Sequence, residues 1–168
     1  MQLLFVDIEA SGLHLDSYPI EFAVLDENGK IHEWLIKPLQ DWSYWDPRAE
    51  LIHGISRETL AKKGMEPALV ATELNKRFRR KVLYSDAQQW DLMWTQILFY
   101  DTRIKLEFEI HAIQSLMSSD QIKQFARHKE QLSMQGKIKH RAADDAKQLA
   151  LISQRFIGNG AAGDPLCG

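Results

Sequence analysis

The sequence predicts an α/β fold in which helices cover both faces of a mixed sheet. Two observations support this fold class. An apolar strand opens the chain and is followed by a hairpin, and helical and extended segments then alternate to the end. A hairpin joins antiparallel strands, whereas alternating helices and strands are typical of layered α/β folds.

The first three strands are predicted near the N-terminus. Residues 2–9 begin with the apolar run Leu3–Val6, which is typical of a buried strand. Residues 20–27 and 30–37 are predicted to form a hairpin, because Asn28-Gly29 between them is a strong turn signal.

The middle of the chain is predicted to be mainly helical. Residues 38–55 are expected to form a loop with short helical pieces, and Ser56 is expected to cap a helix ending near Lys63. Pro67 then opens a longer helix that runs to about Arg80. Apolar residues recur in this helix at a spacing of four: Val70, Leu74 and Phe78.

The last third continues the alternation. A fourth strand is predicted over residues 81–85, a helix over 88–99 and a fifth strand over 103–110. Gly136 interrupts the helical segments that follow. These segments are expected near residues 111–117, 119–132 and 140–156.

Length and composition indicate one globular domain. The 168 residues are 45% hydrophobic and 26% charged, which excludes a disordered chain, a collagen and a coiled coil. The net charge of −2 argues against a basic surface that wraps long duplexes. We assign residues 1–157 to the domain and expect 158–168, which offer little to pack, to form a flexible tail.

The composition also bears on location. The apolar runs are far shorter than the roughly 20 residues of a membrane span, so no membrane association is expected. No secretory signal is expected either, because the first strand follows Met1-Gln2 directly. Cys167 is the single cysteine, so an internal disulfide is excluded and a cytoplasmic location is expected.

Two carboxylates at the end of the first strand are the strongest functional signal. Asp7 and Glu9 are two residues apart, so in a strand both side chains point to the same face. Two like charges at this spacing repel unless a cation lies between them, and divalent cations such as Mg²⁺ prefer oxygen ligands. Gly12, in the turn that follows, allows a ligand to approach the backbone closely.

Two further acidic segments carry less information alone. His140 lies close to Asp144 and Asp145, where an imidazole could serve as a general base, although acids in a first helical turn also stabilise a helix. Asp86 follows the fourth strand and is expected to cap the next helix, while Asp91 lies inside that helix.

Taken together, these segments resemble the DEDDh, or DnaQ-like, superfamily of 3′–5′ exonucleases. Asp7-Ile-Glu-Ala-Ser-Gly-Leu13 resembles its first motif, and His140 with Asp145 resembles its His-x4-Asp motif. Ile52-His-Gly-Ile-Ser56 and Tyr18-Pro-Ile-Glu21 also match family segments in the right order. The likeness covers roughly residues 3–150, and it implies a ribonuclease H-like three-layer fold with a mixed five-stranded sheet.

The resemblance implies a phosphodiester hydrolase with two metal ions, Mg²⁺ or Mn²⁺. Asp7, Glu9, Asp91 and Asp145 would hold the ions, and His140 would take the proton of the attacking water. The middle motif departs from the family pattern by one extra residue, so Asp86 remains a competitor for the position of Asp91. Zinc is disfavoured because no thiolate is present.

Helix geometry alone pairs His140 with Asp144, whereas the family pattern pairs it with Asp145. Both statements hold if His140 lies in the loop before the helix and only Asp145 faces the site. The related DEDDy variant is excluded, because the position of its tyrosine is Arg141 here.

The resemblance also implies a single-stranded DNA or RNA 3′ end as substrate and a nucleoside monophosphate as product. Residues beside the terminal nucleotide would be Ala10, Ser11, Gly12, Leu13, His53 and Ile55. Trp42, Tyr44 and Trp45 could stack on bases, but anchoring their loop is the favoured role. Many relatives are dimers, so the resemblance is compatible with a homodimer.

Three basic clusters in the sequence are candidates for phosphate contacts. Lys76–Lys81 and Arg127–Lys129 are expected to be solvated helix faces, whereas Lys137–Arg141 lies beside the predicted site and is the better candidate for guiding phosphate. Two functions of other classes stay open: an inactive nucleic-acid-binding module and a partner subunit that uses the same fold.

Overall fold

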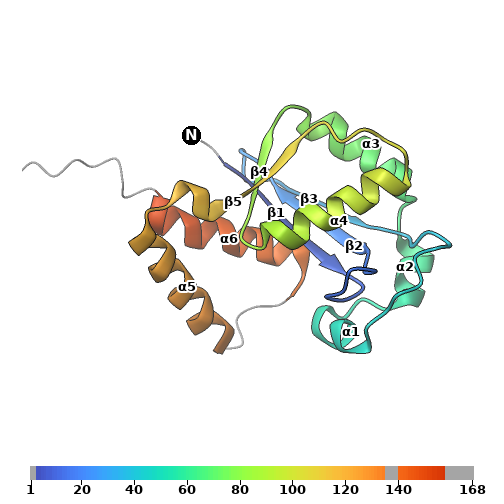
Figure 1. The fold of residues 1–168 in the computed structure, drawn as a ribbon, viewed down its shortest axis with the longest axis horizontal. Coiled ribbons are helices and arrows are strands. Elements are labelled where there is room, and N and C mark those ends of the chain that lie inside the picture. The colour runs from blue at the N-terminus through green and yellow to red at the C-terminus, as the bar shows by residue number, and fades with distance from the viewer. Residues whose placement is uncertain (1–2, 135–139, 158–168) are drawn as a thin grey trace, which may run out of the picture.

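The structure is a computed structural model and describes residues 3–134 and 140–157. The chain forms one five-stranded sheet surrounded by helices (Figure 1). In chain order the elements are β1 (Leu4–Ala10), β2 (Pro19–Leu25), β3 (Ile31–Leu35), α1 (Pro47–His53), α2 (Arg57–Lys63), α3 (Pro67–Phe78), β4 (Val82–Ser85), α4 (Gln88–Asp101), β5 (Glu109–Ala112), the 3-10 helix η1 (Ile113–Leu116), α5 (Ser119–Met134) and α6 (Ala142–Ile157).

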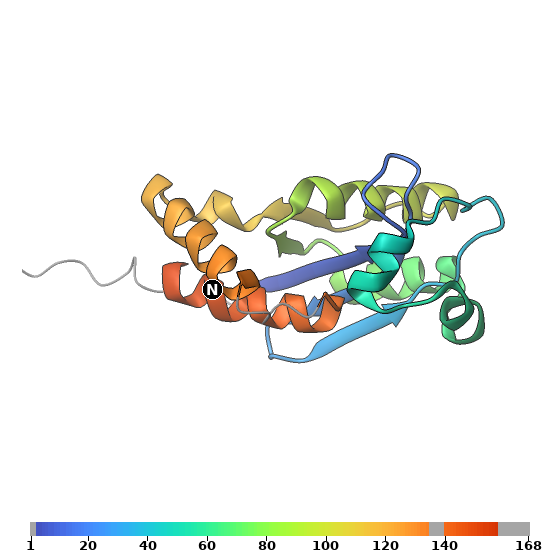
Figure 2. The ribbon, with the colours of Figure 1, turned by 90° about the horizontal axis from the view of Figure 1, so that it is seen from below.

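The sheet is mixed and has helices on both faces, as predicted. Its strand order is β3-β2-β1-β4-β5. The first three strands are antiparallel neighbours, whereas β4 is parallel to β1 and β5 is parallel to β4. Helix α6 packs on β1, β2 and β3 from one side, and α4 lies on the opposite side of β1 (Figure 2).

The alternation of side chains along β1 decides which face holds the polar site. Val6 and Ile8 are buried in the main core together with residues of α3 and α4. Phe5 points the other way and packs in a second cluster with Leu149 of α6. Because side chains in a strand alternate, Asp7 and Glu9 share the face of Phe5 and therefore lie on the α6 side of the sheet.

The predicted hairpin is present, but its loop is longer than the two-residue turn. Strand β2 ends at Leu25, and the Asp26 carboxylate accepts hydrogen bonds from the backbone N–H groups of Asn28 and Lys30, both at 2.9 Å. Gly29 has the positive φ of 76° that closes this loop. The aspartate therefore organises the turn.

The predicted cap at Ser56 is confirmed, because its hydroxyl accepts a hydrogen bond from Thr59 N–H at 3.1 Å. The predicted fifth strand over 103–110 is wrong in its start, since β5 comprises only Glu109–Ala112. The Asn75 side chain donates to the carbonyl of Lys105 and accepts from Glu107 N–H. These bonds hold the segment before β5 outside the sheet.

The helical segments after β5 also differ in detail. Ile113–Leu116 is a 3-10 helix, and α6 begins at Ala142, so His140 precedes it. Gly136 and the predicted tail 158–168 lie outside the described residues. Over residues 3–134 and 140–157, none of the helices has the length and apolar character needed to span a bilayer.

Candidate active site

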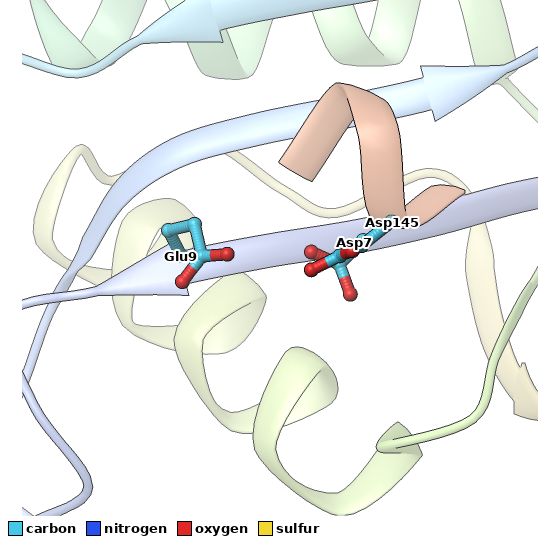
Figure 3. Close-up of side chains that lie close together, drawn as sticks. All are labelled: Asp7, Glu9 and Asp145. Atoms are coloured by element: carbon cyan, nitrogen blue, oxygen red, sulfur yellow. The ribbon is translucent and has the colours of Figure 1, made fainter. Parts of the chain in front are cut away.

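Three carboxylates from two elements converge beside the sheet. Asp7 and Glu9 project from β1, and Asp145 projects from the first turn of α6 (Figure 3). One carboxylate oxygen from each lies within 4.8 Å of the others. Residues about 140 positions apart in the chain thus form one cluster of oxygen ligands, which is the donor type that hard divalent cations prefer.

The electrostatics of this cluster favour the protonated acids. Burial raises the pKa of Glu9 to about 7, and the charges of Asp145 and Glu21 add to the effect. Burial likewise raises the pKa of Asp145 to about 6, against the opposing positive charges of His140 and Lys129. Burial, followed by the charge of Asp91, raises the pKa of Asp7 well above its usual range. Bound cations would remove this repulsion.

Asp91 enters the same pocket from the first turn of α4. Asp91 is not one of the three residues whose carboxylate oxygens lie within 4.8 Å of one another, but it lines the pocket. Among the neighbouring charges, that of Asp91 raises the pKa of Asp7 most. The Ser85 hydroxyl donates a hydrogen bond to the Asp91 carboxylate and accepts one from Ala87 N–H at 2.9 Å. Burial raises the pKa of Asp91, and the bond from Ser85 opposes this. The serine at the end of β4 thus orients Asp91.

Asp86, the competing carboxylate, has a different partner. It lines the pocket, but its carboxylate forms an ion pair with the ammonium group of Lys129 from α5. The cluster Arg127–Lys129 was expected on a solvated helix face, and this is correct for the exposed Arg127 but wrong for Lys129, which lines the pocket. Asp86 is therefore already neutralised by a cation of the chain.

His140 and Asp145 line one pocket, and Asp144 is not among its lining residues. His140 precedes α6 and has a left-handed backbone, with φ of 50°. This backbone turn brings both groups to the pocket although they are five residues apart.

The start of α6 is fixed by Glu21, which sequence analysis did not single out for this role. Glu21 is fully buried on β2, directly opposite Glu9. Both oxygens of its carboxylate accept a bifurcated hydrogen bond of 3.1 Å from the Nε–H of Arg141. The carboxylate also accepts hydrogen bonds from Nη2 of Arg141 and, at 2.8 Å, from Ala142 N–H. The signal was present, since an acid at a buried strand position requires a partner.

This arrangement corrects the expectation for the cluster Lys137–Arg141. The Arg141 guanidinium is bound by Glu21 and, at 3.3 Å, by Glu33, so it points to the sheet and not to the pocket. Residues 137–139 lie outside the described residues.

The pocket has a volume of about 410 Å³ and extends from the acids toward α1. Of the residues expected beside a terminal nucleotide, four line it: Ala10, Gly12, Leu13 and His53. Ser11 and Ile55 are buried and do not line it. The Ser11 hydroxyl accepts a hydrogen bond from Tyr18 N–H, and its carbonyl accepts one from Asp46 N–H. Ser11 therefore joins two loops.

His53 lines the pocket and has a buried ring nitrogen without a partner among the described residues. Its Nδ1 accepts a hydrogen bond from Ile55 N–H at 3.0 Å, which places the proton of the neutral ring on Nε2. Burial lowers the pKa of His53, which favours this neutral form. Nε2 is buried and has no partner among the described residues. Such a donor costs about 1–3 kcal/mol unless a ligand supplies an acceptor.

Two apolar lining residues were missed from the sequence. Ile52, at the end of α1, is 56% exposed and lines the same pocket as the 71% exposed Leu13. Trp90 also lines it and stacks on Trp94 with ring centroids 5.5 Å apart. Exposed apolar side chains at a pocket mouth indicate contact with an apolar part of a ligand. The pattern of α1 and α4 alone does not reveal which apolar residues remain uncovered.

The aromatic loop serves mainly as an anchor, as favoured from the sequence. Trp42 is buried, stacks on Tyr18 and donates to Asp101 at 2.6 Å. Trp45 donates to Glu50 at 2.7 Å. Tyr44 approaches Gly12 so closely that a Cβ atom there would lie 2.9 Å from its ring, which explains the glycine.

Comparisons with known proteins identify the family and the fold. The RNase T family model, described as an exonuclease, matches residues 4–152. No curated protein sequence matches the chain significantly. One similar solved structure is an apo exonuclease I, with 22% identity and a TM-score of 0.57 over 68% of this chain and 29% of that one. E. coli exonuclease I with a 5cy-dA13 oligonucleotide has 19% identity and a TM-score of 0.68 over 94% of this chain and 41% of that one. Exonuclease I from Methylocaldum szegediense has 17% identity and a TM-score of 0.67 over 91% of this chain and 40% of that one. The chain thus spans less than half the length of these enzymes.

Proposed function

Because the chain belongs to the RNase T family of exonucleases, within the DEDDh superfamily, we propose that it is a metal-dependent 3′–5′ exonuclease. It would release nucleoside monophosphates from single-stranded ends or short oligonucleotides. The observation that carries this proposal is the convergence of Asp7, Glu9 and Asp145 in one pocket. The oligonucleotide bound to the similar E. coli exonuclease I supports a single-stranded substrate.

The residues present fit a pair of divalent ions, Mg²⁺ or Mn²⁺. All donors in the cluster are carboxylate oxygens, and their mutual repulsion raises their pKa values in the absence of a cation. We assign Asp7, Glu9, Asp91 and Asp145 as the holding groups. Bound ions of this class activate a water and stabilise the leaving oxygen of a phosphodiester.

Asp91 rather than Asp86 is our choice for the fourth group. Asp91 acts most strongly on Asp7 and is held by Ser85, whereas Asp86 is paired with Lys129. A carboxylate that already binds an ammonium group is a poorer cation ligand, because the pair must break first.

His140 is proposed as the general base. Its ring lies at the pocket and is exposed, so a ring nitrogen can accept the proton of the attacking water and later release it to solvent. The oxygen of that water forms the new bond to phosphorus, and the bond from phosphorus to the 3′ oxygen of the preceding nucleotide breaks. The leaving oxygen takes its proton from solvent.

The terminal nucleotide is proposed to lie between the acids and α1. Leu13 and Ile52 would contact its base, and the backbone of Ala10 and Gly12 would border its sugar. The free Nε2–H of His53 would donate to an oxygen of the nucleotide. Whether the strand is DNA or RNA depends on contacts with the 2′ position.

A labelled-substrate assay tests the proposal. Single-stranded DNA and RNA oligomers with a 5′ label should give a ladder that shortens from the 3′ end in Mg²⁺ or Mn²⁺ and no products in EDTA. Asp7→Asn should abolish the ladder, whereas Asp120→Asn, a change at an 84% exposed residue of α5, should not. Internal cuts, or full activity of Asp7→Asn, would contradict the proposal.

The boundaries of the exonuclease domain are also a proposal. Residues 1–157 are taken as the exonuclease domain, and the family model covers most of this range. The cytoplasmic location and the homodimer stay predictions, which cell fractionation and sedimentation of the purified chain would test.

A further inference from the structure

Lys129 is held at the pocket by the packing of α5 on α6. Phe125 is buried, and its ring meets that of Phe156 edge-on with centroids 6.1 Å apart. The side chain of Gln121 donates a hydrogen bond to the carbonyl of Phe156. Lys129 follows Phe125 by four residues, so both lie on the inward face of the helix.

The pocket needs a cation at this place. Among the described residues that line it, six are carboxylates and two carry a fixed positive charge, Arg48 and Lys129, which leaves four negative charges. Two divalent ions would cancel these four charges, whereas without Lys129 five negative charges would remain, one more than two such ions can cancel, and would oppose an entering phosphate. Lys129 is the cation that lies next to the acids, because its charge acts on both Asp91 and Asp145.

The ion pair with Asp86 leaves the Lys129 ammonium group able to bind a further acceptor. The Asp86 side chain is 10% exposed, whereas that of Lys129 is 39% exposed. The aspartate is therefore the fixed partner, and the lysine stem is open to solvent on one side. Lysine has three rotatable donors, so its ammonium can bind a second acceptor without leaving the first.

We propose that Lys129 binds a non-bridging phosphate oxygen of the bound strand and that Asp86 holds its ammonium group in position for this contact. This inference rests on the proposed function, since it requires that a nucleic-acid strand enters the pocket.

The salt dependence of binding tests this contact. On single strands, each neutralised phosphate contributes about 0.7 to the slope of log affinity against log salt concentration. We expect Lys129→Gln to reduce this slope by about 0.7, so that over a fourfold rise in salt the wild type loses about 2.6-fold more affinity than the variant. Fluorescence anisotropy of a 5′-labelled oligonucleotide in Ca²⁺ buffer measures binding directly, without reliance on turnover.

Three further variants make the result specific. Lys123→Gln removes the same charge from the same helix, but the Lys123 side chain is 66% exposed and its ammonium group pairs with Asp120, so the slope of this variant should equal that of the wild type. Lys129→Arg should keep the slope, because the charge and the phosphate-binding donors remain. Asp86→Asn should reduce the slope, by less than Lys129→Gln does, because the charge of Lys129 remains but its ammonium group is no longer held toward the phosphate. A wild-type slope in Asp86→Asn would overturn the positioning role of Asp86.

The outcomes separate the two proposals. If the wild type binds no single strand in any salt, the proposed function itself fails and this inference falls with it. If the wild type binds but Lys129→Gln and Lys123→Gln have equal slopes, the assignment of Lys129 is overturned while the proposed function stands. A melting curve for each variant verifies that the fold is intact.

Discussion

Replacing Glu9 by glutamine should stabilise the metal-free protein, in a manner that depends on pH. Burial, Asp145 and Glu21 raise the pKa of Glu9 from 4.5 to about 7 in the folded chain. Because the pKa of Glu9 is higher in the folded than in the unfolded chain, the protonated side chain favours the folded state. This contribution to the unfolding free energy is fully present below about pH 4.5 and is lost as the pH rises through about 7. Glutamine resembles the protonated acid at every pH and therefore avoids this loss.

The magnitude follows from the size of the pKa change. A rise from 4.5 to about 7, at about 1.36 kcal/mol per unit, corresponds to about 3 kcal/mol at pH 8. Water reaches part of the Glu9 carboxylate and screens it, so we expect about 1–2 kcal/mol. Urea unfolding of Glu9→Gln and wild type in EDTA, at pH 5 and pH 8, measures the difference.

A glutamate on the exposed side of α5 provides the control. Glu130→Gln changes the same functional groups outside the pocket and should leave the pH dependence of stability unaltered. If Glu9→Gln gains no more stability between pH 5 and pH 8 than Glu130→Gln does, the acids of the pocket do not repel each other as described.

Three other perturbations follow from the same geometry. Asp91→Asn should lower kcat by about 10²-fold or more, whereas Asp86→Asn should lower kcat less than tenfold. Steady-state kinetics compares the two variants, and a larger loss in Asp86→Asn would favour Asp86 as the ligand. Mg²⁺ should raise the melting temperature more at pH 8 than at pH 5, because the acids with raised pKa values bind protons at the lower pH; calorimetry that shows the opposite trend would contradict this. Glu21→Ala should cost about 2–3 kcal/mol of unfolding free energy, because Arg141 and Ala142 N–H lose their acceptor; a urea-unfolding loss below about 0.5 kcal/mol would refute it.

The part of the site that could be predicted from sequence is the part set by local geometry. Asp7 and Glu9 share a face because β1 is a regular strand, and the period of two requires it. The mixed sheet followed from the hairpin and the alternation of elements. Asp145 was reached only through resemblance, since helix periodicity alone favours Asp144 and no local rule places His140 outside the helix.

What the sequence could not supply depends on contacts between distant segments. Lys129 lies in a charge-rich helix, and only the packing of Phe125 on Phe156 shows that its face is turned inward. Arg141 was expected to guide phosphate, but the buried acid Glu21 on β2 binds it instead. Ser11 occupies a motif position that suggested substrate contact, and its hydrogen bonds join two loops.

Equilibrium binding of Mn²⁺, followed by electron paramagnetic resonance in the presence of a nucleoside monophosphate, tests the central claim most directly. The wild type should bind two ions per chain, and Asp7→Asn, which removes the carboxylate at the centre of the cluster, should bind none with comparable affinity. An unchanged stoichiometry in Asp7→Asn, or no Mn²⁺ binding by the wild type, would contradict a metal-dependent nuclease site at the end of β1.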